Sequence, residues 1–77
     1  MRKFTFKTGR VYDSEQVLDC EIIEENAEGD TLLVDVTDKA RGMYFQVTLY
    51  LFCKHTELSD YFLGDMVLKL YDKGDYI

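Results

Sequence analysis

The sequence predicts a mainly β domain, a small antiparallel five-stranded sheet with a short helical turn before the last strand. Apolar and polar residues alternate in several short stretches, and the stretches are bounded by residues typical of turns. Within residues 17–52 the stretches are separated by about five residues, a usual length for hairpin loops. With 77 residues the chain has room for one small core. We therefore expect a single compact domain over residues 1–77.

The first two strands are predicted from alternation with a period of two. The first lies in RKFTFKT, where Phe4 and Phe6 alternate with polar residues. The second lies within residues 17–25, and one of its faces is apolar, with Leu18, Cys20 and Ile22. Its other face is largely acidic, with Asp19, Glu21, Ile23 and Glu25. We expect the apolar face to join the core and the acidic face to meet solvent.

A third strand over residues 31–37 and a fourth over residues 43–52 follow the turns NAEGD and DKARG. Together with the second strand they form a predicted antiparallel meander. The inward residues of the third strand are Leu32, Val34 and Val36. Those of the fourth, MYFQVTLYLF, are Met43, Phe45, Val47, Leu49 and Leu51. The opposite face of the fourth strand carries the aromatic residues Tyr44, Tyr50 and Phe52.

Residues 55–77 fit two patterns. In the preferred one, Thr56 caps a short helical turn, Gly64 ends it, and MVLKLY forms the fifth strand with Met66, Leu68 and Leu70 inward. In the alternative, one helix runs from about residue 57 to residue 72, with Gly64 inside it at a cost of about 1 kcal/mol relative to alanine. The alternative gives an α+β fold, a four-stranded meander plus one C-terminal helix.

The preferred order of elements, four strands, a helical turn and a closing strand, is similar to that of SH3-like small barrels. The resemblance covers element order along most of the chain and includes no family-specific residues. It implies that the sheet closes into a small barrel.

The charge balance restricts the partners. Fifteen acidic and nine basic residues give a net charge of -6, which opposes binding to nucleic acid and to anionic membranes and favours a basic protein partner. The apolar runs are far shorter than the roughly 20 residues that span a bilayer. The first residues lack the continuous apolar region of a signal peptide. We therefore expect a cytoplasmic protein without a membrane segment.

No motif in the sequence points to catalysis, to a cofactor or to a metal. Cys53 and His55 lie two residues apart, but the chain offers only these two and Cys20 as nitrogen or sulfur ligands, one fewer than structural zinc requires. We expect both cysteines to be buried free thiols and His55 to be solvated. The isolated glycines form no phosphate loop. The sequence therefore predicts a non-enzymatic protein with no cofactor and no bound metal.

The outward face of the meander is the predicted binding surface, with Tyr44, Tyr50, Phe52, Asp19, Glu21 and Asp35. Tyrosines provide a large contact area with few rotors, and carboxylates attract the lysines and arginines of a partner. The resulting hypothesis is a small acidic inhibitor or regulator that docks on a basic surface, such as a nucleic-acid-binding one. In size and charge the chain resembles acidic proteins by which phages and mobile elements block host enzymes.

Two alternatives remain for this surface. In the first, the C-terminal segment folds over it, so that Tyr50 and Phe52 become a second layer of core. In the second, the chain is a structural subunit that forms homodimers through an edge strand or through the aromatic face.

Overall fold

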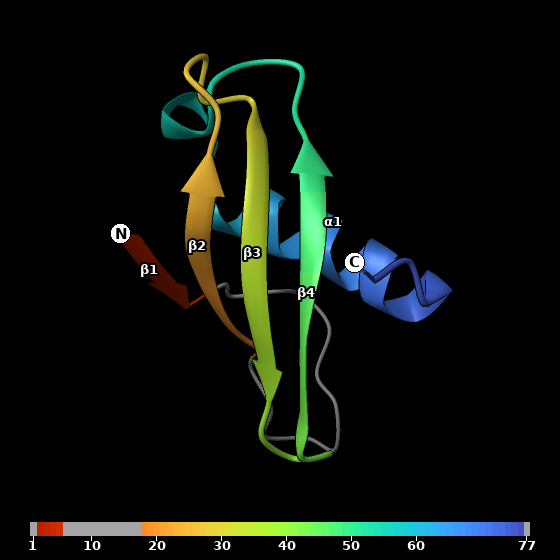
Figure 1. Cartoon of the computed structure of the whole chain (residues 1–77). Coiled ribbons are helices and arrows are strands. Elements are labelled where there is room, and N and C mark those ends of the chain that lie inside the picture. The colour runs from red at the N-terminus through yellow and green to blue at the C-terminus, as the bar shows by residue number, and fades with distance from the viewer. Residues whose placement is uncertain (1, 6–17, 77) are drawn as a thin grey trace.

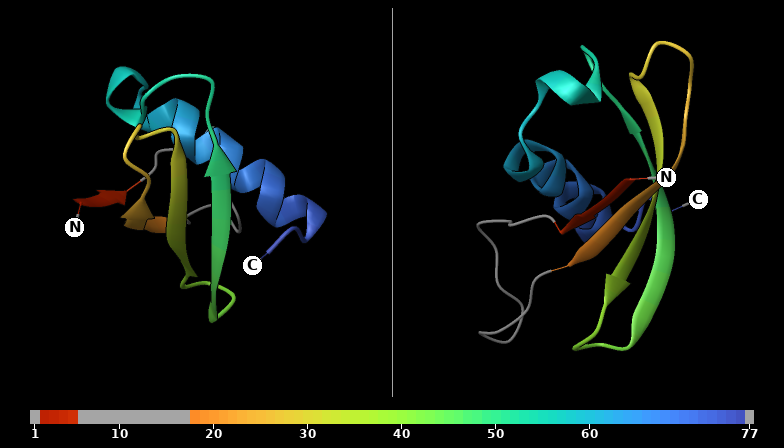
Figure 2. Two further views of the ribbon diagram at one scale, coloured as in Figure 1. Left: turned by 45° about the horizontal axis from the view of Figure 1, so that its top comes forward. Right: turned by 90° about the vertical axis from the view of Figure 1, so that its left-hand side faces the viewer.

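A computed structural model describes residues 2–5 as backbone and residues 18–76 in full. The described strands form one antiparallel sheet of four in the order β1-β2-β3-β4, namely β1 (Arg2–Thr5), β2 (Asp19–Glu25), β3 (Thr31–Asp38) and β4 (Met43–Tyr50). A short 3-10 helix, η1 (His55–Glu57), and a longer helix, α1 (Asp60–Lys73), follow. Figures 1 and 2 show α1 crossing one face of the sheet, so that the molecule has two layers.

The predicted meander of β2, β3 and β4 is confirmed. Ile22 pairs with Val34, and Val34 pairs with Val47, so the apolar faces of the three strands coincide. The ladder between β3 and β4 is continuous, whereas the ladder between β2 and β3 shifts register at Ile23. The predicted first strand is present as β1, and its remaining residues 6–8 lie outside the described part of the chain.

The core fills the space between the inner face of the sheet and α1. The sheet contributes buried aliphatic side chains and a thiol from Leu18, Cys20, Ile22, Leu32, Val34, Val36, Val47 and Leu49. The helix contributes Leu63, Val67, Leu68 and Tyr71. Full burial of an aliphatic side chain of this size stabilises a fold by roughly 1.5 to 3 kcal/mol. The alternation therefore identified most of the inner face correctly, but Met43, at the start of β4, is 36% exposed, and Leu51 lies beyond the strand and is only half-buried.

The predicted fifth strand and the SH3-like barrel are wrong, because MVLKLY lies within α1 and the sheet is open. Leu63, Val67 and Tyr71 are spaced four residues apart, so in a helix they form one apolar stripe. An apolar sheet face needs a second layer above it, which a helix supplies and a further strand in the same sheet does not. The α+β alternative is confirmed, with helix bounds of Asp60–Lys73.

The N-terminus of α1 is capped by Ser59 and not by Thr56. The Ser59 backbone is extended, and its Oγ accepts a hydrogen bond from the Phe62 N–H at 3.1 Å. This is the standard use of a serine side chain at a helix start, where backbone N–H groups lack helical partners. Thr56 lies instead inside η1.

The helix passes through Gly64, the predicted stop, and ends at Gly74. Gly64 is buried within α1, where packing against the core offsets its low helix propensity. Gly74 has a φ of 75°, and its N–H donates to the Tyr71 carbonyl oxygen at 3.1 Å. The Asp75 N–H donates to the Leu70 carbonyl oxygen at 3.0 Å. This pair of bonds is a Schellman motif, which favours glycine at the left-handed position.

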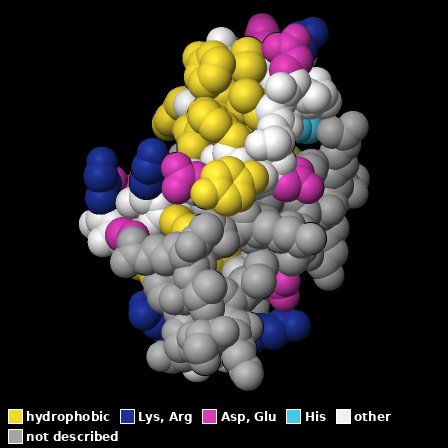
Figure 3. Space-filling view, turned by 180° about the vertical axis from the view of Figure 1, so that it is seen from behind, with side chains coloured by type: hydrophobic (Ala, Val, Ile, Leu, Met, Phe, Trp, Pro, Cys, Tyr) yellow, Lys and Arg dark blue, Asp and Glu magenta, His cyan; other side chains and the backbone are white. Residues whose placement is uncertain are grey.

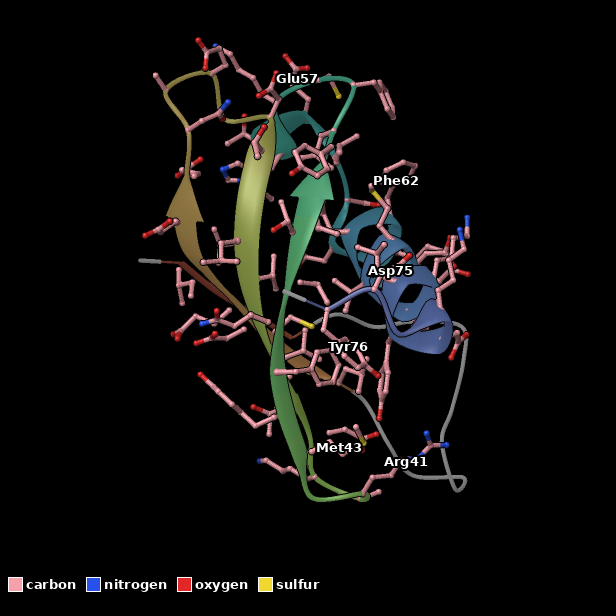
Figure 4. All side chains as sticks on the ribbon, turned by 45° about the vertical axis from the view of Figure 1, so that its right-hand side comes forward. Arg41, Met43, Glu57, Phe62, Asp75 and Tyr76 are labelled. Atoms are coloured by element: carbon pink, nitrogen blue, oxygen red, sulfur yellow. The ribbon has the colours of Figure 1, made fainter. Side chains whose placement is uncertain are left out.

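A buried polar cluster joins the C-terminal half of α1 to the β3–β4 turn. Asp38 is fully buried and accepts hydrogen bonds from the Tyr71 hydroxyl at 2.9 Å and from the Arg41 N–H at 3.3 Å. Figure 4 shows Arg41 and Met43 at this end of the molecule, and the Met43 sulfur lies 3.2 Å from the Tyr71 hydroxyl oxygen. Burial, together with the hydrogen bond to Asp38, raises the pKa of Tyr71.

The capping assignment predicts unequal effects of two similar substitutions. Ser59→Ala removes the acceptor for the Phe62 N–H and should lower the free energy of unfolding by about 1 kcal/mol. Thr56→Ala should change it much less, since Thr56 caps nothing in α1. Urea denaturation followed by circular dichroism measures both values. Equal losses in the two variants would contradict the assignment.

The buried hydroxyl of Tyr71 predicts a pH-dependent stability. Tyr71→Phe removes a hydrogen-bond donor from the buried Asp38 carboxylate. It should lower the free energy of unfolding by about 1 to 3 kcal/mol near neutral pH. The pKa of Tyr71 is raised in the folded state, so the Tyr71 hydroxyl contributes its full stabilisation of the fold below the unfolded pKa of about 10. This stabilisation is lost as the pH rises through the folded pKa. The difference in stability between wild type and Tyr71→Phe should therefore shrink above about pH 10. Chemical denaturation across that range tests this, and a constant difference would refute it.

Candidate functional site

Four of the predicted site residues share the face of the sheet opposite α1. Asp19 pairs with Thr37, which pairs with Tyr44 on the next strand. Glu21 pairs with Asp35 in the neighbouring row. Paired residues of antiparallel strands point to the same side of the sheet. We call Asp19, Glu21, Asp35 and Tyr44 the outer-face cluster. The sheet face opposite α1 is the one nearer the viewer in Figure 1.

Asp35 organises this cluster. Its two carboxylate oxygens accept hydrogen bonds from the Tyr44 hydroxyl at 2.7 Å and from the Gln46 side-chain amide at 2.9 Å. Bonds to a charged acceptor are stronger than bonds between neutral groups, so the Tyr44 ring is held in place although it is 66% exposed. The hydrogen bond to Asp35 raises the pKa of Tyr44, which stays a neutral phenol at neutral pH.

The cluster surrounds a shallow hollow of about 290 Å³, lined by Asp19, Cys20, Glu21, Asp35, Thr37, Lys39 and Tyr44. Three carboxylates face one lysine there. Lys39 lies 3.3 Å from an Asp19 oxygen, but its side chain is 76% exposed, so this ion pair is weak and easily replaced. The arrangement suits a cationic side chain that exchanges for Lys39 and adds contacts to the neighbouring carboxylates.

Tyr50 and Phe52 are exposed but lie apart from this cluster. The alternative in which the C-terminal segment covers them is wrong, because α1 lies on the inner face and their exposed fractions are 74% and 80%. β4 ends at Tyr50, so Phe52 no longer follows the alternation of the strand. Its ring meets the Phe62 ring edge to face, with centroids 5.8 Å apart.

A second surface, of which the sequence predicts only Tyr50 and Phe52, follows the edge of β4 that no described strand pairs with. A groove of about 280 Å³ between β4 and α1 includes Tyr50, Met66 and Leu70 in its lining. Phe62 precedes Met66 by one helical turn and contacts Phe52. We call Tyr50, Phe52, Phe62, Met66 and Leu70 the edge patch. Figure 3 shows hydrophobic side chains gathered on the helix side of the molecule, and Figure 4 places Phe62 on α1 toward the end of β4.

The helical residues of the edge patch escape a prediction that places residues 66–70 in a strand. That assignment put Met66 and Leu70 into the core, whereas the helix turns them to the border of the core, where both are half-buried. The spacing of Phe62, Met66 and Leu70 by four residues is the signal that could have found them, since it forms a second apolar stripe beside the core stripe.

The burial of the two cysteines and of His55 differs in part from the prediction. Cys20 is a buried free thiol as predicted, and burial raises its pKa. Cys53 is only half-buried, and His55 is buried. The chain turns back after β4 and sets His55 against the β2–β3 turn, with His55 Nε2 2.6 Å from Glu25 Oε2 and the His55 N–H donating to the Gly29 carbonyl at 2.9 Å. His55 therefore joins η1 to that turn.

Comparison of the chain with protein-family models, with curated proteins and with solved structures gives no match. Within residues 2–5 and 18–76, no helix has the length and apolar character needed to cross a membrane. In the same part of the chain, no three side chains of histidine, cysteine, aspartate or glutamate are grouped so that they could hold a metal ion.

The hydrogen bond between Tyr44 and Asp35 is testable by titration. Asp35→Asn removes the carboxylate that raises the pKa of Tyr44, so this pKa should fall toward the ordinary value of about 10. Titration of the Tyr44 ring resonances by nuclear magnetic resonance measures the pKa in both proteins. Glu21→Gln serves as the control, because Glu21 acts on Tyr44 through its charge alone and should have the smaller effect. A larger effect of Glu21→Gln would contradict the geometry.

Proposed function

We propose that this chain is a non-enzymatic protein-binding module that docks its outer-face cluster on a basic surface of a partner protein. It would act as a small acidic inhibitor or regulator, and the nucleic-acid-binding groove of an enzyme is one surface of the required chemistry. The observation that carries the proposal is the placement of Asp19, Glu21, Asp35 and Tyr44 on one face around a shared hollow.

The charges of the cluster support association with a cationic surface. Several carboxylates within one hollow give a local negative potential, and the net charge of -6 extends it over the molecule. Such a field speeds the encounter with a basic partner and weakens as salt is added. Asp19 and Glu21 act mainly through this attraction between charges and less through fixed contacts, since neither is held by as many hydrogen bonds as Asp35.

The hydrogen bonds of the cluster support specific contact. Tyr44 is fixed by Asp35 before any partner arrives, so little side-chain entropy is lost when it is covered. Tyrosine is also one of the residue types that dominate binding energy at interfaces, where truncation of a central residue costs about 2 kcal/mol or more. Tyr44 is therefore the expected hot spot, and the carboxylates around it orient the partner.

The proposal is tested with two variants of equal charge. One carries Asp19→Lys, Glu21→Lys and Asp35→Lys on the outer face, and the other carries Glu28→Lys, Glu57→Lys and Asp75→Lys at exposed positions elsewhere. Three such reversals bring the net charge from -6 to 0 in each variant. Tagged wild type and both variants, each with folding checked by circular dichroism, are used to capture proteins from the lysate of the native host.

We expect a basic protein to be retained by wild type and by the Glu28/Glu57/Asp75 variant, and to be lost with the outer-face variant. Its affinity for wild type should fall as salt rises, as measured by calorimetry with the purified partner. Equal loss in both variants would show that net charge alone accounts for the capture, and equal retention would show that another surface binds. Either result would reject the proposal.

A further inference from the structure

Two hollows lie in line on the face of the sheet opposite α1. The first is the hollow of the outer-face cluster. The second, of about 540 Å³, includes Glu24, Leu33 and Thr48 in its lining. These three residues form one row of register pairs across β2, β3 and β4. Along β3, Leu33 precedes Thr37 of the first hollow by four residues, which separates the two hollows by roughly 13 Å.

The second hollow combines an apolar side chain with a carboxylate. Leu33 is half-buried on the outer face, and Glu24 beside it is exposed. The register between the strands shifts at Ile23, so that Glu24 and not Ile23 pairs with Leu33. Bulges redirect side chains in this way and are frequent next to functional sites. The hollow therefore suits a side chain with an apolar stem and a cationic end, such as arginine or lysine.

The face that holds both hollows is acidic. All the charged residues that the register places on this face of β2 and β3 are carboxylates, namely Asp19, Glu21, Glu24 and Asp35. Two lysines border them. Lys39 forms the weak ion pair with Asp19, and the backbone of Lys3 pairs with that of Glu21. Carboxylates thus exceed lysines two to one, and the complementary occupant is basic.

The backbone of this face is already paired. β2 and β3 lie inside the sheet, so the face offers side chains and no open row of backbone groups. An extended segment pressed on it would have its own N–H and C=O groups covered without partners, whereas a helix pairs these groups internally. Figures 1 and 2 show α1 on one face of the sheet and none of the described helices or strands on the other. A helix is therefore the element suited to cover the outer face.

We infer that the outer face binds a basic helix of the partner protein, which lies along β2 and β3 and carries two arginine or lysine residues seven positions apart. Seven helical residues advance by roughly 10 Å and return to the same side of the helix, and the length of the basic side chains covers the remaining distance. One cationic end enters the outer-face cluster. The other side chain lies on Leu33 with its charge near Glu24. This inference rests on the proposed function and adds the form of the segment that binds.

The experiment uses three alanine-based peptides of about 18 residues, which is long enough for a helix in water. The first carries two arginines seven positions apart, on one side of the helix. The second carries them five positions apart, on nearly opposite sides, and the third has the first spacing with a helix-breaking proline between the arginines. All three have the same charge. Titration of isotope-labelled protein at low salt, followed by nuclear magnetic resonance, gives each affinity and the residues whose amides shift.

We expect the first peptide to bind wild type roughly fivefold tighter than either control peptide, which is the gain from one exposed ion pair. Amide resonances of residues 19–21 and 33–37 should shift. Glu24→Gln should abolish this preference, whereas Glu57→Gln, an equal loss of charge on η1, should preserve it. Equal affinities of the three peptides for wild type, no binding, or equal effects of the two substitutions would overturn the inference. The comparison of peptides on wild type requires no variant to fold.

Failure of this inference is distinguishable from failure of the proposed function. If capture from the lysate depends on the outer face while the three peptides bind equally, the docking function stands and the helical form of the bound segment is rejected. If the first peptide is preferred but no basic protein is captured through the outer face, the proposed function is rejected and the recognition of a basic helix stands.

Discussion

The structure depends on covering one apolar face of an open sheet. The alternation in β2, β3 and β4 collects their aliphatic side chains on a single side, and water would contact all of them without a second layer. α1 supplies that layer with Leu63, Val67, Leu68 and Tyr71. Since one helix covers one face, the other face keeps its polar side chains, and the free edge of β4 stays open in the described part of the chain.

Polar contacts then decide how the helix lies on the sheet. Hydrophobic burial has no direction, whereas the buried hydrogen bond from Tyr71 to Asp38 favours one position of α1 along the sheet. Ser59 and Gly74 fix where the helix begins and ends. In the position that the Tyr71–Asp38 bond and the two caps favour, the C-terminal half of α1 extends past β4. Met66 and Leu70 therefore line a groove and do not lie in the centre of the core.

The parts of the fold that local patterns decide could be predicted, and the parts that tertiary contacts decide could not. A period of two gave the strands and the side of the sheet on which Asp19, Asp35 and Tyr44 lie. Residues 66–71 satisfy both periods, and the need to cover the sheet selects the helix. Phe52 left the predicted surface because β4 ends two residues earlier, and the burial of His55 depends on a turn that is distant in sequence.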